Sequence, residues 1–307
     1  MKHEKKKRVQ KNVLVFGAEG MLGKEFCYAL RKNARYRVFP ASHRTADITD
    51  ESALAGCMKK VRPDIVINCA AFINVDACED HVLKAWQVNA LGPGNIVRAL
   101  GDAKLRRAVF VHISTSDVFG NDKKAYRETD TPHPVNAYGG SKYGGENNVE
   151  HEARSAGLRY YIVRTSWIYS RFRETYFIDT VAKALARSET LTLVSDQKSV
   201  PTWTRDLVRS VLPLCFGRNN SGTYHVVNDA ERAVSKYEIA LEIKRILCFG
   251  SGALRTRAAR ARLRRAFRKD IFKVERPASP FLINTKLPKL PHWKRSLKEY
   301  ILSLHLV

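Results

Sequence analysis

The sequence lacks any uninterrupted run of about 18 apolar residues, the length that a membrane-spanning helix requires, although 44% of its 307 residues are hydrophobic. Its first residues, MKHEKKKRVQKN, are mostly charged and contain no apolar stretch of the kind found in a secretory signal. We therefore expect no membrane span and a cytoplasmic protein. The length allows a substantial core, in one large domain or two smaller ones.

Cysteine is sparse and unclustered. The six cysteines include no C-x-x-C pair, which argues against a zinc site and against the disulfide framework of a small secreted domain. Two of them, Cys27 and Cys69, have apolar neighbours. Free structural thiols and no metal site are the expectation.

Acidic residues are few beside basic ones: 30 Asp and Glu face 54 Lys and Arg, giving a formal net charge of +24. Such a surface attracts phosphate groups, whether they belong to a nucleotide, a nucleic acid or an anionic lipid. A host with generally basic proteins would show the same balance. Charge alone therefore leaves the partner open.

Strands and helices alternate through the first half of the chain. Short apolar runs typical of buried strands occupy residues 13–16, 36–42, 64–72, 108–120 and 158–169. Helical spacing of apolar residues is found between them, at 17–32, 51–63, 81–100 and around Tyr138. The alternation predicts an α/β fold with a Rossmann-type, doubly wound parallel sheet that helices cover on both faces.

Three glycines follow the first predicted strand in G-x-x-G-x-x-G spacing. Gly17 permits a tight turn, Gly20 lets the backbone approach a pyrophosphate, and Gly23 lets helix and strand pack closely. The position directly after VLVF predicts a dinucleotide site. A tight strand–helix turn without a ligand is the alternative.

The end of the second predicted strand distinguishes the two nicotinamide cofactors. An acidic residue there would bind a ribose hydroxyl, whereas a basic one would accommodate the 2′-phosphate of NADPH. The sequence has Ser42, His43 and Arg44 and no acid, which favours NADPH, with NADH as the alternative. Asp47 and Ile48 are expected to border the adenine.

The looser pattern after residue 170 indicates a second unit. It contains predicted helices at 174–189 and 204–216, a strand and loop at 191–203, and a strand at 222–229. We expect residues 1–169 to form an NAD(P)-binding domain to which 200–230 return. Residues 170–307 would mainly form a smaller, discontinuous substrate lobe, with the cleft at the carboxyl ends of the strands.

A tyrosine and a lysine stand four residues apart in NAYGGSKYGGE, so that a helix places Tyr138 and Lys142 on one face. The strand ending VHISTSDVFG brings the hydroxyls of Ser114, Thr115 and Ser116 to the edge of the same sheet. A hydroxyl there can bind a substrate carbonyl while Tyr138 donates a proton, and a nearby cation would favour the tyrosinate that remains. This combination predicts carbonyl reduction, although an isolated Y-x-x-x-K arises often by chance.

The chain resembles the extended short-chain dehydrogenase/reductase family, and within it the dTDP-4-dehydrorhamnose reductase group. The resemblance extends from about residue 12 to 301, through VLVFGAEGMLG, RPDIVINCAAFINVDACE, VNALGPGNIV, HISTSDVFG, YRETDTPHPVNAYGGSKYGGE, VRTSWIY, DQKSVPTW and RPASPFLINTKL. It implies Thr115, Tyr138 and Lys142 as catalytic residues, the last two also touching the cofactor.

The resemblance also implies binding residues. The cofactor would be bordered by Gly17, Met21, Leu22, Asp47, Ile48, Ala70, Ala71 and Asn89, with Ser166, Trp167 and Ile168 near the nicotinamide. Asn74 and Asp76 would reach the sugar region, and Trp203 and Arg276 the nucleotide-sugar side. Packing is the alternative role for Trp203, and surface charge for Arg276.

The chain departs from the group's pattern at three places. Ser116 and Asp117 replace the residues of S-T-D-Y-V-F or S-T-D-E-V-F, and Ser199 stands where a glycine is usual. Residues 255–276 form a longer and more basic segment, with ten Lys and Arg against two acids. Leu263, Phe267 and Ile271 recur every four residues there, which predicts a helix with one apolar face. It could dock on the small lobe, lie on an anionic membrane surface or, least favoured, contact nucleic acid.

The resemblance therefore implies an NAD(P)H-dependent oxidoreductase that reduces the C4 ketone of a nucleotide-diphosphate deoxysugar. The expected substrate is dTDP-4-dehydro-β-L-rhamnose, and a homodimer is considered. A reductase of another nucleotide sugar is the first alternative. A regulatory protein that resembles the β subunit of methionine adenosyltransferase is the second.

Overall fold

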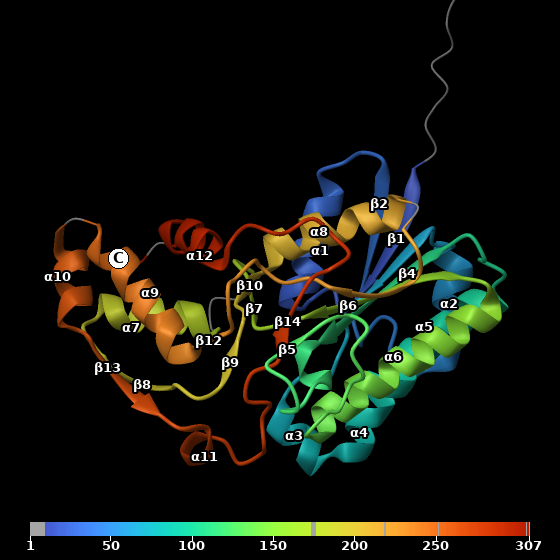
Figure 1. Ribbon diagram of the computed structural model, residues 1–307. Coiled ribbons are helices and arrows are strands. Elements are labelled where there is room, and N and C mark those ends of the chain that lie inside the picture. The colour runs from blue at the N-terminus through green and yellow to red at the C-terminus, as the bar shows by residue number, and fades with distance from the viewer. Residues whose placement is uncertain (1–9, 173–175, 218, 251, 305, 307) are drawn as a thin grey trace, which may run out of the picture.

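A six-stranded parallel sheet forms the centre of the computed structural model, which describes residues 10–172, 176–217, 219–250, 252–304 and 306 (Figure 1). Its strand order is β11-β6-β4-β3-β1-β2. These strands are β1 (Lys11–Phe16), β2 (Tyr36–Ala41), β3 (Ile65–Asn68), β4 (Val109–Thr115), β6 (Arg159–Thr165) and β11 (Gly222–His225). All neighbouring pairs are parallel. The predicted Rossmann-type fold is confirmed.

Helices cover both faces of this sheet (Figure 1). They are α1 (Met21–Arg31), α2 (Glu51–Val61), α5 (Gly92–Asp102), α6 (Ala137–Ala156) and α8 (Thr204–Phe216). Side chains alternate along a strand, so Val13 and Val15 of β1 pack with the apolar residues of α1 and α8. Leu14 and Phe16 enter the opposite core, with α2, α5 and α6. The continuous apolar run of β1 is thus buried on both sides.

The predicted helix at 81–100 is interrupted. It consists of α4 (Val82–Trp86), a π-helical turn (Gln87–Leu91) and α5, and it follows the short helix α3 (Val75–Asp80). In the π-helical turn, the buried Asn89 side chain accepts a hydrogen bond from the amide of Phe72 at 2.8 Å and donates one to its carbonyl at 2.9 Å. The turn therefore fixes the loop that leaves β3.

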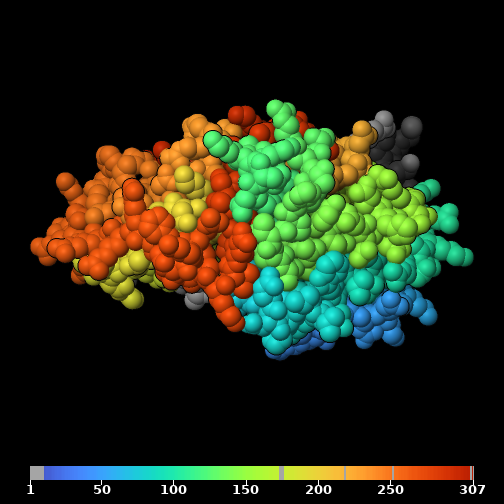
Figure 2. All heavy atoms as spheres, turned by 60° about the horizontal axis from the view of Figure 1, so that its bottom comes forward, coloured from blue at the N-terminus to red at the C-terminus, as the bar shows by residue number. Residues whose placement is uncertain are grey.

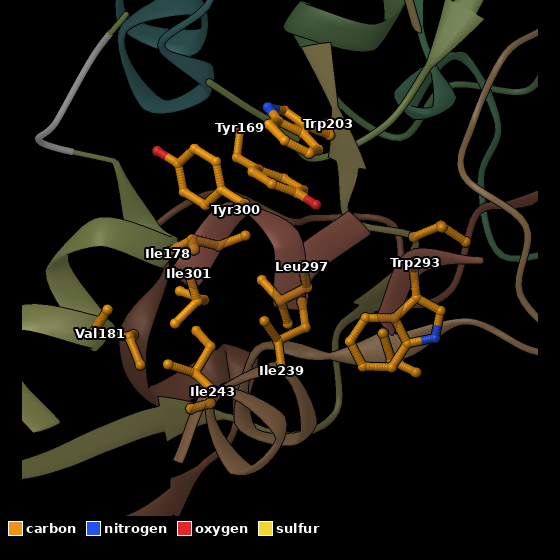
Figure 3. Packing of buried hydrophobic residues seen from close by; sticks show 14 of the residues in the cluster. Tyr169, Ile178, Val181, Trp203, Ile239, Ile243, Trp293, Leu297, Tyr300 and Ile301 are labelled. Atoms are coloured by element: carbon orange, nitrogen blue, oxygen red, sulfur yellow. The ribbon is translucent and has the colours of Figure 1, made fainter. Parts of the chain in front are cut away.

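The C-terminal lobe has a core of its own. Its elements are β7 (Ile168–Tyr169), α7 (Phe177–Ala186), β8 (Thr190–Val194), β9 (Lys198–Ser199), β10 (Thr202–Trp203), β12 (Val234–Ser235), α9 (Lys236–Cys248), α10 (Gly252–Arg260), β13 (Arg262–Ala266), α11 (Arg268–Ile271), β14 (Phe281–Leu282) and α12 (Trp293–Leu302), with β14 pairing to β5 (Ala125–Tyr126). Figure 3 shows side chains of α7, α9 and α12 meeting below the rings of Tyr169, Trp203 and Tyr300.

The chain returns to the central sheet after it has entered the lobe. Helix α8 packs against α1, and β11 pairs with β6 at the edge of the sheet. The central sheet is therefore completed by residues that follow part of the lobe in sequence.

The predicted helix with one apolar face in the basic segment is wrong. The segment forms α10, β13 and α11 instead, and β13 pairs in parallel with β8 from Arg262 to Ala266. Leu263 is half-buried in that strand, whereas Phe267 and Ile271 are 54% and 52% exposed. The four-residue spacing was misleading because a strand also explains it. In β13 the half-buried Leu263 alternates with the exposed Arg262 and Arg264.

Two further boundaries differ from expectation. The predicted strand at 158–169 splits into β6 and β7 because Trp167 adopts a positive φ of 37°. The predicted helix at 174–189 corresponds to α7, and residues 174 and 175 lie outside the described residues. No helix in the described ranges has the length and apolar character needed to cross a membrane.

Candidate active site

A pocket of about 900 Å³ lies at the carboxyl ends of β1, β2, β3, β4 and β6 and extends to the C-terminal lobe. From the N-terminal side it is lined by the turn between β1 and α1, and from the lobe by α7, α9 and the loop containing Phe272 and Arg276. Most of the residues predicted to bind ligands line it. They are Gly17, Gly20, Met21, Leu22, Gly23, Ser42, His43, Asp47, Ile48, Ala70, Ala71, Thr115, Ser116, Tyr138, Lys142, Ser166, Trp167, Ile168 and Arg276.

The glycine turn brings backbone close to backbone. Gly17 has a positive φ of 67°, and a Cβ there would lie 2.6 Å from the amide nitrogen of Ala70. A Cβ on Gly23 would lie 2.2 Å from the carbonyl oxygen of Gly17. Gly20 is the N-cap of α1 and provides no side-chain cap, so amides of the first helical turn keep their donors for an anion. The turn therefore fits a dinucleotide pyrophosphate.

The strand end expected to distinguish the cofactors is only partly in the pocket. Ser42 and His43 line it, whereas Arg44 is exposed and is absent from its lining. The prediction that Arg44 lies at the cofactor is therefore not matched by its position. Asp47 lines the pocket, and its Oδ1 accepts hydrogen bonds from the amide and hydroxyl of Thr49.

Small residues let α6 approach its neighbours closely. Asn136 caps the helix by accepting a hydrogen bond from the amide of Gly139 at 2.8 Å. A Cβ on Gly139 would lie 2.2 Å from the carbonyl oxygen of Asp117, and one on Gly145 would lie 2.1 Å from that of Asn89. The glycines flanking Tyr138 and Lys142 thus allow the helix to press both side chains against the end of β4.

Lys142 is buried and bound to β4. Its Nζ donates a hydrogen bond to the carbonyl of Ile113 at 2.7 Å and lies 3.4 Å from Nε2 of His112. Burial lowers the pKa of Lys142 to about 8, although the nearby Glu146 carboxylate opposes this. Burial, and then the Lys142 charge, hold the pKa of His112 well below its usual value. His112 is therefore neutral, and its Nε2 can accept a hydrogen bond from Lys142 Nζ.

Tyr138 differs in one respect from the expectation. Its pKa is raised, first by burial and then by the Asp117 carboxylate, while an interaction with the Thr115 hydroxyl opposes the rise. The expected lowering of this pKa by Lys142 is wrong for this structure, because burial and the Asp117 carboxylate raise the pKa by more than the Thr115 hydroxyl lowers it. Tyr138 consequently remains protonated at neutral pH, which is the form that a proton donor needs.

The residues predicted to bind substrate fall into two sets. Ser116 and Arg276 line the pocket, and Arg276 forms an ion pair with Asp76 at 2.8 Å. Asp76 and Asn74 are not part of its lining, and Asn74 caps α3 through the amide of Ala77. The buried Asn89 is likewise outside the lining.

Trp203 belongs to the core of the lobe and not to the pocket. Its ring stacks on Tyr169 with centroids 6.3 Å apart and meets Tyr300 edge-on at 5.6 Å (Figure 3). Only 5% of its surface is exposed. The alternative reading of Trp203 as a packing aromatic therefore fits its position, and direct contact with a ligand in this pocket does not.

Several pocket residues could not be predicted from the sequence. Lys236, at the first position of α9, has its Nζ 5.8, 5.7 and 5.2 Å from the ring centroids of Trp167, Phe177 and Phe272. Burial lowers the pKa of Lys236. No short motif surrounds this lysine, and only the folding of the lobe places it beside Trp167 and Phe272.

Comparison with known proteins agrees with this architecture. The model of the RmlD substrate binding domain family matches residues 11–305. The chain belongs to this family. The membership confirms the predicted group of extended short-chain dehydrogenases/reductases.

The following relatives of this RmlD family member cover from 70% to 96% of the chain. The spore coat polysaccharide biosynthesis protein SpsK of Bacillus subtilis strain 168 is 34% identical over 94% of this chain and 96% of its own. A dTDP-4-dehydrorhamnose reductase of Streptomyces griseus is 35% identical over 70% of each chain. A solved structure of dTDP-4-dehydrorhamnose reductase from Bacillus anthracis str. Ames in complex with NADP is 28% identical. It covers 96% of this chain and 100% of that one, with a TM-score of 0.84.

Proposed function

We propose that this protein is an NADPH-dependent oxidoreductase that reduces the C4 ketone of dTDP-4-dehydro-β-L-rhamnose to give dTDP-L-rhamnose. The main observation in support is that Thr115, Tyr138 and Lys142 line the same pocket as the glycine turn. Relatives named dTDP-4-dehydrorhamnose reductase and the NADP complex of a similar structure support it.

The residues of the pocket fit NADPH. The backbone around Gly17 and Gly20 lines the pocket and would hold the pyrophosphate. Ser42 and His43 would face the adenosine ribose, and Lys142 the nicotinamide ribose. When bound, the reduced nicotinamide supplies the hydride.

The protein's own part in the reaction is to hold the carbonyl and deliver a proton. The Thr115 hydroxyl lies at the end of β4 and would bind the ketone oxygen. The Tyr138 hydroxyl would transfer its proton to that oxygen as negative charge develops there. The Lys142 ammonium, anchored by the carbonyl of Ile113, would orient the ribose.

A panel of 4-keto nucleotide sugars, followed by the absorbance of NADPH and NADH, tests this function. We expect NADPH oxidation with dTDP-linked ketones and weaker activity with NADH. Other sugars belong in the panel because relatives include a dTDP-4-keto-6-deoxy-D-glucose reductase of Streptomyces niveus. If the protein reduced only another sugar of the panel, the proposed substrate would be replaced by that sugar. An absence of turnover with every ketone would favour a regulatory protein.

The pH dependence provides a separate prediction. Burial lowers the pKa of Lys142 to about 8, so the lysine loses its charge as the pH rises through that value. We expect kcat/KM for NADPH to fall as the pH rises through about 8, because this ratio reports groups of the free enzyme. Initial rates of NADPH oxidation between about pH 6 and about pH 10 would check this pH dependence, with circular dichroism to confirm folding. A flat profile over this range would contradict the assigned role of Lys142.

We also propose that the basic surface docks on an anionic membrane. This surface consists of exposed residues of α10, β13 and α11 at the outer edge of the lobe, and Figure 2 shows this orange segment at one end of the molecule. Its cations are Arg255, Arg257, Arg260, Arg262, Arg264, Arg265 and Lys269, none of which joins an ion pair among the described residues. The exposed Phe267 and Ile271 lie in the same segment and could enter the headgroup region.

Vesicle binding tests the basic surface. We expect cosedimentation with phosphatidylglycerol vesicles but not with neutral phosphatidylcholine vesicles. Because each cation near such a surface contributes about 1 kcal/mol, the R262E/R264E variant should bind at least about tenfold more weakly. The control is K59E/K60E, which reverses two exposed charges on α2. An absence of vesicle binding at physiological salt would remove the proposal. Binding to RNA without binding to vesicles would indicate a nucleic-acid surface.

The formation of a homodimer stays a prediction.

A further inference from the structure

One carboxyl group in the pocket has no part in the reduction described above. Asp117 lies in the 3-10 turn Ser116–Val118, directly after β4, and lines the pocket with Thr115 and Tyr138. Its amide donates a hydrogen bond to Thr115 Oγ1 at 3.2 Å, and its Oδ1 accepts one from Ser116 Oγ at 3.1 Å. The carboxyl group is therefore held beside the hydroxyl proposed to bind the ketone.

The backbone of Asp117 is fixed relative to Tyr138. Helix α6 presses on the turn at Gly139, the residue after Tyr138, where a Cβ would approach the Asp117 carbonyl oxygen to 2.2 Å. The two side chains are close enough that the Asp117 charge is, after burial, the largest influence raising the pKa of Tyr138. A ketone held by Thr115 and Tyr138 would thus have Asp117 near the carbons on either side of its carbonyl.

Asp117 is not neutralised by a direct partner. No ion pair of the described residues includes it; Arg276 is paired with Asp76. The cations of Arg276 and of Lys236 on α9 face the same pocket and favour its charged form, but burial dominates and the pKa of Asp117 is raised. A carboxylate with a raised pKa is a better proton acceptor than one in water.

We propose that Asp117 is a general base for the carbon next to the substrate's ketone, so that the pocket catalyses reversible enolisation as well as reduction. The C–H bond next to the carbonyl breaks and its proton passes to the Asp117 carboxylate. The electron pair forms a C=C bond to the carbonyl carbon, and the carbonyl oxygen takes the Tyr138 proton. The reverse steps restore the ketone, with no net oxidation or reduction. The inference rests on the proposed reduction of a C4 ketone.

Hydrogen exchange tests this activity apart from reduction. The protein is incubated in D₂O with NADP⁺, which cannot deliver a hydride, and with dTDP-4-keto-6-deoxy-D-glucose, and with any other ketone that the panel finds to be reduced. Mass spectrometry and proton NMR report deuterium at carbons next to the carbonyl. We expect exchange well above an enzyme-free sample, and at least about 100-fold slower exchange in Asp117→Asn, since a positioned base contributes about 10²–10⁴-fold.

Matched variants separate the base from general damage. Asp102→Asn, on the exposed end of α5, should exchange like the wild type. NADP⁺ binding shows whether Asp117→Asn is folded, and Asp117→Ser, which also removes the carboxyl group, replaces it if it is not. Wild-type exchange no faster than the enzyme-free rate, or exchange that persists without the carboxyl group, overturns the inference. NADPH oxidation without exchange would leave the reductase in place and remove only this second activity.

Discussion

Tyr138→Phe is expected to reduce turnover by about 10²–10⁴-fold while leaving NADPH affinity nearly unchanged. The substitution removes one hydroxyl from a half-buried residue whose raised pKa keeps it protonated. The proposed cofactor contacts lie mainly in the glycine turn and at Lys142, so they survive the change. Steady-state NADPH oxidation gives turnover, and quenching of protein fluorescence gives the affinity.

Tyr143→Phe is the matched control for this variant. Tyr143 lies on the same helix, is half-buried against the lobe core and does not line the pocket. Its turnover should stay close to that of the wild type. Retained activity in Tyr138→Phe would mean that another group supplies the proton, and the half-buried Asp117 would be the first candidate.

Glu146→Ala is expected to lower the free energy of unfolding by about 3–5 kcal/mol. Glu146 binds Nε and Nη2 of Arg164 at 2.9 and 2.6 Å and also accepts a hydrogen bond from Ser114. The two charged side chains are only 3% and 5% exposed. Removing the carboxylate leaves the buried Arg164 guanidinium without its counter-charge. Arg164 Nη1 has no hydrogen-bond partner among the described residues even with Glu146 in place.

Urea unfolding of single and double variants distinguishes this cause from loss of packing. The Glu146→Met/Arg164→Met variant removes both charges and should be more stable than Glu146→Ala, because an apolar pair can replace a buried ion pair at little net cost. A loss below about 1 kcal/mol for Glu146→Ala would show that water reaches Arg164. The pair lies one helical turn beyond Lys142, so it also secures the segment of α6 that carries the proposed site.

Local patterns in the sequence were enough to predict the sheet and the glycine turn. Each of these depends on neighbours in the chain: an apolar run for β1, and small residues where backbone meets backbone near Gly17. The same holds for the four-residue spacing of Tyr138 and Lys142 on α6. The pocket brings these segments together because the carboxyl ends of parallel strands share one edge.

The features that could not be predicted depend on contacts between distant segments. Strand β13 forms because β8, about 70 residues earlier, offers it a partner. Lys236 reaches the pocket only through the packing of α9, and Trp203 turns away from it to join the aromatic core. The pKa of Tyr138 likewise follows from burial, which the sequence does not specify.

The late return of α8 and β11 to the central sheet limits how the two units can be exchanged. A fragment that stops at residue 169 would lose the edge strand beside β6 and expose the apolar side of α1 that α8 covers. Engineers who wish to change sugar preference by recombination would therefore need more than one crossover point. A chimaera with a single crossover point would disrupt the central sheet as well as the lobe intended for replacement.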